Sequence, residues 1–124
     1  MKITRVVCAP NHCTFKIPAI KKLLEFHLPE NGCIVDPFAR ESKLGTITND
    51  INPLLDTDYN LPADVFAHML YQKKIAIDCV LFDPPYTRRQ MLEMYQGYGL
   101  HFGQDESQQF GHWSTVKGLL APLI

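Results

Sequence analysis

The sequence contains no apolar stretch near the ~18 residues that a membrane-spanning helix requires, and its N-terminus lacks the continuous apolar core of a signal peptide. It also has no internal repeat and no low-complexity linker. Its 124 residues, 46% of them hydrophobic and 20% charged, are enough for one compact domain with a core of its own. We therefore expect a soluble, cytoplasmic protein with a single domain over residues 1–124.

The sequence also lacks an excess of either positive or negative charge. The formal net charge is −1, from 12 Lys and Arg against 13 Asp and Glu. This balance argues against a strongly basic nucleic-acid binder, because phosphate contacts need an excess of cations. Any affinity for DNA must come from a local patch such as Arg88-Arg89 or from a segment that is missing.

Paired cysteines are absent too, since Cys8, Cys13, Cys33 and Cys79 do not form paired CxxC spacings. Cys33 and Cys79 lie in apolar runs and are expected to be small buried hydrophobes. Cys8, His12 and Cys13 together could be argued as part of a metal site. Their spacing is not that of a structural zinc knuckle, so we predict no metal and reduced thiols.

The most informative segment is Asp83-Pro84-Pro85-Tyr86, which follows the apolar run 75–82. A short run rich in β-branched and aromatic residues, stopped by two prolines, predicts a buried parallel strand that opens into a loop. Ligands of open α/β sheets bind at that edge. Asp83 and the Pro84 carbonyl can accept the hydrogens of an amino group on a flat ring, and Tyr86 can stack on that ring. The alternative is a rigid turn in which Asp83 only caps the next helix.

A second segment, Asp36-Pro37-Phe38-Ala39, also ends an apolar run, and residues 45–53 then supply a further strand that ends in Asp50. These motifs and their order resemble those of amino-group DNA methyltransferases that use S-adenosylmethionine, in particular the small adenine-specific enzymes common in phages. The resemblance covers nearly the whole chain and implies an α/β, Rossmann-like class I methyltransferase fold with strand order 3-2-1-4. A generic nucleotide-binding α/β domain is the alternative.

The resemblance also assigns roles to residues. It implies that Asp36 and Phe38 contact the methionine end of the cofactor, and that Asp50 accepts hydrogen bonds from the ribose hydroxyls. Asn52 is placed in the same cofactor site. Phe15 belongs to the N-terminal segment 11–17 that contacts the cofactor in the family, although a simple cap and first helical turn would explain that segment as well.

The chain departs from the family pattern at three places. Arg40-Glu41-Ser42 stand where glycines are expected, so Arg40 either folds away or points its guanidinium at the cofactor carboxylate. The crossover from residue 39 to residue 45 has room for a turn or two of helix at most. Pro62 falls about where the adenine-binding acidic residue is expected, and Asp64 is the nearest substitute.

Periodicity and turn residues predict the remaining elements. Thr14 can cap a first helix that ends before Pro29. A helix from Pro62 to about residue 72 is expected to turn Val65 and Phe66 inward, together with Met69 and Leu70. The predicted strands cover residues 33–37, 46–50, 58–61 and 75–82, and further helices are predicted at 89–95 and 113–120.

The function that follows from the resemblance is methyl transfer to N6 of adenine in DNA, with S-adenosylmethionine as cofactor. The expected partner is DNA that carries the adenine target. If the chain is phage-encoded, the expected location is the cytoplasm of the host cell. A cofactor-binding pseudoenzyme that partners another subunit and a nucleic-acid-binding module with a vestigial site remain alternatives.

The family fold continues with a fifth strand and a β-hairpin, which the sequence does not contain after Ile124. We therefore expect a methyltransferase domain that lacks its C-terminal strands. Its open sheet edge is expected to favour oligomers or a second chain that closes it, and the chain alone is expected to be a poor enzyme.

Overall fold

The computed structural model describes residues 14–85 and 110–124. The chain divides into two compact units, Met1–Glu30 and Asn31–Ile124, which are described separately below. The predictions made for Cys8, His12 and Cys13, for Tyr86 and Arg88-Arg89, and for a helix at 89–95 lie outside the described residues.

The N-terminal unit contains the 3-10 helix η1, Thr14–Lys16, and the helix α1, Pro18–His27. Ile17 occupies the position before α1, and no side-chain hydrogen bond caps the helix. The prediction that Thr14 caps this helix was therefore wrong. Pro18 explains the start instead, because its fixed φ suits the first helical position and needs no N–H partner there.

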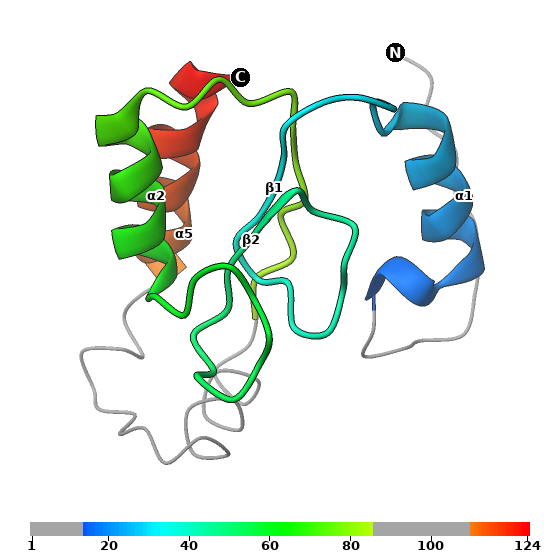
Figure 1. The fold of residues 1–124 in the computed structure, drawn as a ribbon, viewed down its shortest axis with the longest axis horizontal. Helices are drawn as coiled ribbons and strands as arrows, with labels where there is room; N and C mark the ends of the chain where they lie inside the picture. Colours follow the sequence, from blue (N-terminus) through cyan, green and yellow to red (C-terminus); the bar gives the residue numbers. More distant parts are fainter. Residues whose placement is uncertain (1–13, 86–109) are drawn as a thin grey trace. The chain divides into compact units, whose positions relative to one another are not determined.

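The C-terminal unit is a small α/β domain with an open, parallel sheet of three strands in the order β2-β1-β3 (Figure 1). Val35 of the central strand is in register with Ile47 on one side and Val80 on the other. The strands are β1 (Ile34–Asp36), β2 (Ile47–Thr48) and β3 (Cys79–Val80). The predicted α/β class with a parallel sheet is confirmed at this level.

Beside β2 the predicted strand 58–61 is reduced to one parallel bridge between Asn49 and Tyr59. Two main-chain bonds form this bridge, from the Tyr59 N–H to the Thr48 carbonyl at 3.1 Å and from the Asp50 N–H to the Tyr59 carbonyl at 3.2 Å, while a side chain takes the next ladder donor. Asp58 Oδ2 accepts hydrogen bonds from the Thr48 N–H at 2.8 Å and from the Thr48 hydroxyl at 3.1 Å. The four-stranded order 3-2-1-4 therefore stays a prediction.

The predicted strand 75–82 is also shorter in the structure, although its pairing with β1 extends beyond β3. The Leu81 N–H donates to the Val35 carbonyl at 2.8 Å. Further back, the Ile77 N–H donates to the Leu123 carbonyl at 2.9 Å, so the start of this segment pairs with the end of the chain instead of with β1. The main-chain groups are thus satisfied without a longer strand.

Two helices, α2 (Ala63–Lys73) and α5 (Phe110–Leu120), pack side by side against the sheet (Figure 1). A short 3-10 helix η2, Ala121–Leu123, follows α5. The prediction of inward residues on α2 holds for Phe66 and Leu70, but Val65 is 47% exposed.

None of the described helices combines the length and apolarity needed to cross a membrane. The buried core consists of Val35, Phe66, Ala67, Leu70, Ile77, Trp113, Val116 and Leu120.

The crossover between β1 and β2 contains turns and no helix, which is within the limit of a turn or two of helix that its short length predicted. Its last part needs a glycine, because a Cβ atom at Gly45 would lie 3.0 Å from the Asp36 Cβ atom and 3.3 Å from the Ile34 carbonyl oxygen. Because Gly45 has no side chain, the crossover can pass close to β1 just before β2 begins.

Candidate functional site

Three acidic residues follow the ends of three sheet segments in the C-terminal unit. Asp36 is the last residue of β1, Asp50 comes shortly after β2, and Asp83 comes shortly after β3. Because the strands are parallel, their carboxyl ends meet at one edge of the sheet. The structure thus brings together three predicted site residues that lie far apart in the sequence.

Asp36 is the electrostatic centre of this group. Burial raises the pKa of the Asp36 carboxyl to about 7, a hydrogen bond from the Phe38 N–H opposes the rise, and the charges of Asp83 and Asp50 add to it. A group with such a pKa exchanges its proton near neutral pH. A positive group bound beside Asp36 would favour its ionised form.

The two oxygens of Asp36 have different surroundings. Oδ1 accepts a hydrogen bond from the Phe38 N–H at 3.2 Å. Oδ2 is buried and has no hydrogen-bond partner among the described residues. Buried polar atoms are nearly always paired, so this oxygen is a candidate acceptor for a donor that the described residues do not supply.

Asp50 is held by main-chain donors on both sides. Its Oδ2 accepts from the Arg40 N–H at 2.9 Å, and its Oδ1 accepts from the Asn52 N–H at 2.9 Å. A carboxylate has about four acceptor positions, so two remain for a ligand. The two bonds fix the orientation of Asp50, which is an advantage for a binding group.

Arg40 has a backbone conformation that favours glycine. Its φ is 52°, in the left-handed region where residues with a Cβ atom are disfavoured. The hydrogen bond from the Arg40 N–H to Asp50 holds this conformation. The chain therefore keeps a glycine-like turn although the sequence has no glycine at this position.

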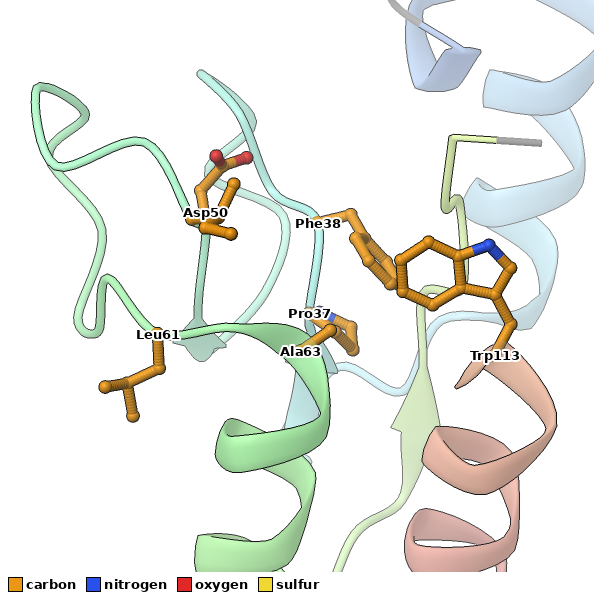
Figure 2. A pocket seen from close by; sticks show the side chains of 7 residues that line it. Pro37, Phe38, Asp50, Leu61, Ala63 and Trp113 are labelled. Carbon is orange, nitrogen blue, oxygen red and sulfur yellow. The ribbon is translucent and has the colours of Figure 1, made fainter. Parts of the chain in front are cut away.

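A hollow of about 280 Å³, counted up to its open mouth, lies beside Asp50. Figure 2 shows Phe38 and Trp113 on one side of it and Leu61 on the other. Its enclosed space is only about 20 Å³, room for roughly one water molecule, which is far below the ~300–1,000 Å³ typical of small-molecule pockets. The walls are apolar apart from one carboxylate. The lining residues are Pro37, Phe38, Asp50, Ile51, Leu61, Ala63 and Trp113.

The remaining predicted residues lie as follows. Pro84 and Pro85 are buried, and Asp83 is half-buried. Asp64 is in the first turn of α2 and is not one of the residues that line the hollow. Phe15 belongs to η1 of the N-terminal unit, so its contact with the cofactor stays a prediction.

Asn49 is a structural residue of the site that the sequence reasoning missed. Its side-chain N–H groups donate to the carbonyls of Pro37 at 3.2 Å and Leu61 at 2.9 Å, and its Oδ1 accepts from the Leu61 N–H at 3.0 Å. Asn49 is completely buried. An amide directly before the acidic Asp50, at the end of a strand, is the signal that could have found it.

Trp113 is a second residue that the sequence analysis did not include in the site. The indole belongs to the core and also lines the hollow. Its Nε1–H also donates to the Pro85 carbonyl at 3.2 Å. No pattern in the sequence connects these two segments, because the contact joins residues 28 positions apart.

Comparison with protein-family models, with curated proteins and with solved structures finds no match for this chain. The likeness to amino-group methyltransferases therefore rests on the motifs that begin at Asp36 and at Asp83 and on their order. The function is accordingly a proposal.

Proposed function

We propose that this chain binds S-adenosylmethionine at the carboxyl edge of its sheet and transfers the methyl group to N6 of adenine in DNA. One observation carries the proposal. Asp36, Asp50 and Asp83 lie at one sheet edge, and Asp50 also lines a small apolar hollow.

The residues present fit the cofactor. The orphaned Asp36 Oδ2 is an acceptor for the amino group of the methionine part. Asp50, fixed by its two main-chain donors, has acceptor positions left for the ribose hydroxyls. The apolar walls formed by Ile51 and Leu61 suit the adenine ring. S-adenosylmethionine, when bound, supplies a methyl group on a positively charged sulfur.

The target amino group is assigned to Asp83 and Pro84. The Asp83 carboxylate and the Pro84 carbonyl accept the two amino hydrogens, which leaves the nitrogen lone pair free for the methyl group. Both prolines have fixed φ angles, so the carbonyl is held in place before the target arrives. This arrangement asks little of general-base chemistry, because positioning and hydrogen bonding do most of the work. The sulfur–methyl bond breaks as the nitrogen–methyl bond forms, and the proton that the methylated nitrogen then loses passes to the Asp83 carboxylate or to water. Tyr86, by the resemblance, stacks on the flipped base.

Binding without transfer is the second candidate, and Arg40 favours it. A residue with a long cationic side chain stands at the turn where the family has glycine, and its main-chain N–H donates to the Asp50 carboxylate. A chain of this kind would act as the cofactor-binding partner of another subunit or of a second copy.

The test measures labelled methyl transfer to DNA with and without adenine, together with calorimetric binding of S-adenosylhomocysteine. Asp83→Ala is expected to abolish transfer and to leave the affinity within a few fold. Asp78→Ala is the matched control, because Asp78 is the acidic residue at the amino end of β3, where it accepts from the Cys33 N–H at 2.7 Å.

Transfer to adenine-containing DNA supports the first candidate. Binding without transfer is expected of the second candidate and equally of a chain that is a poor enzyme by itself. Loss of both binding and folding in Asp83→Ala, seen by circular dichroism, favours the turn-capping role of Asp83. Absence of any binding by the unchanged, folded chain contradicts both candidates.

A further inference from the structure

Trp113 connects the hollow to the segment that carries Asp83. The indole is 9% exposed and forms part of the wall of the hollow (Figure 2). Its Nε1–H donates to the Pro85 carbonyl at 3.2 Å in a buried hydrogen bond. One side chain therefore contacts both the place assigned to the cofactor and the segment assigned to the target.

Aromatic contacts extend this connection. The Trp113 and Phe38 rings meet edge to face with centroids 5.1 Å apart, and Phe38 meets Phe82 in the same way at 5.5 Å. One helical turn after Trp113, the Lys117 ammonium lies 5.0 Å from the centroid of the Phe82 ring. The first turns of α5 thus contact both ends of the segment 82–85.

Core packing alone explains only part of this arrangement. The other α5 members of the core, Val116 and Leu120, do not line the hollow. A buried indole N–H needs some acceptor, but here the acceptor is a carbonyl within the two-proline segment. Because both prolines have fixed φ angles, holding the Pro85 carbonyl also restricts the peptide that carries the Pro84 carbonyl.

We propose that Trp113 is a positioning residue, which couples occupation of the hollow to the placement of Asp83 and the Pro84 carbonyl. The inference rests on the proposed function. A ligand in the hollow restricts the indole ring, the indole N–H restricts the Pro85 carbonyl, and the acceptors for the target amino group are fixed when the cofactor is present. Cofactor binding would then prepare the site for its second substrate.

The first experiment uses the fact that Trp113 is the only tryptophan in the sequence. Its fluorescence and its single indole ¹⁵N–¹H resonance are followed during titration of the full chain with S-adenosylhomocysteine, and binding is measured separately by calorimetry. We expect both signals to change with the midpoint that calorimetry gives. Calorimetric binding that leaves both signals unchanged would remove Trp113 from the ligand site and overturn the inference.

The second experiment tests the coupling by hydrogen exchange of the peptide that contains Phe82 and Asp83. In the unchanged chain, saturating S-adenosylhomocysteine should slow this exchange by about tenfold. Exchange requires a local opening of the structure, and the bound ligand should make that opening less favourable by the free energy of about one hydrogen bond. Trp113→Phe keeps an aromatic ring and lacks the N–H. At saturating ligand this variant should show at most a twofold effect.

Leu120→Ala is the control for stability, since Leu120 is a buried core residue of the same helix that does not line the hollow. It should exchange faster overall and still show the full slowing by ligand. Equal slowing in Trp113→Phe and the unchanged chain would contradict the coupling. Equal loss in both variants would show a merely structural role, while absence of calorimetric binding in the unchanged chain would instead contradict the proposed function.

Discussion

Replacement of Asp36 by Asn should change how the stability of the protein depends on pH. Burial and the neighbouring charges raise the pKa of Asp36 from 3.8 to about 7 in the folded protein. The folded state then holds the Asp36 proton more tightly than the unfolded state does. Between these two values the folded state binds more protons, so the free energy of unfolding falls as the pH rises.

The magnitude follows from the size of the shift. One pKa unit corresponds to about 1.36 kcal/mol, so the pKa change to about 7 makes ionised Asp36 cost about 4 kcal/mol of stability above neutral pH. The penalty is small near pH 4 and nearly complete at pH 8. Asn has the same shape and no charge, and it keeps an oxygen for the Phe38 N–H.

The assay is urea denaturation of the unchanged chain and of Asp36→Asn at several values between pH 4 and pH 8. The difference in unfolding free energy between the two proteins should move by about 4 kcal/mol in favour of Asn over this range. Asp56→Asn is the control, because Asp56 is fully exposed in its ion pair with Lys43 and should show little change. A difference that stays constant with pH would refute the reasoning.

Three further substitutions test the architecture of the site by the same denaturation assay. Arg40→Gly should be more stable than Arg40→Ala by about 1 kcal/mol, because only the backbone at φ 52° distinguishes them; equal stability would show that this conformation is not strained. Gly45→Ala should destabilise by about 1–3 kcal/mol, since its Cβ atom would lie 3.0 Å from the Asp36 Cβ atom, and a neutral result would mean that the crossover moves freely. Asn49→Ala should cost about 2–4 kcal/mol, because it leaves buried main-chain groups of Pro37 and Leu61 unpaired, and a cost below about 1 kcal/mol would show that water replaces the amide.

The parallel sheet and its acidic edge could be predicted from the sequence because they depend on local signals. Apolar runs that end at Pro37 and at Pro84 predict where β1 and the β3 segment stop. Once the strands are parallel, Asp36, Asp50 and Asp83 must lie at one edge. The strand lengths were overestimated, because Asp58 and Leu123 supply the partners that longer strands would have supplied.

The walls of the hollow depend on contacts between distant segments, which no local pattern reveals. Trp113 on α5 reaches Phe38 after β1 and Pro85 after β3. The Asn49 amide donates both to the Pro37 carbonyl and to the carbonyl of Leu61, which lies just before α2. These tertiary contacts determine the shape of the hollow, whereas the sequence predicted only Phe38 and Asp50 among its lining residues.

Calorimetric titration of the full chain with S-adenosylhomocysteine tests the central claim most directly. We expect saturable binding with one ligand per chain, weakened by about 1–3 kcal/mol in Asp50→Ala through loss of charge-assisted hydrogen bonds. Asp78→Ala, at the amino end of β3, should bind with the affinity of the unchanged chain. Absence of binding by the folded chain, or equal affinity in Asp50→Ala, would contradict the assignment of this sheet edge as the cofactor site.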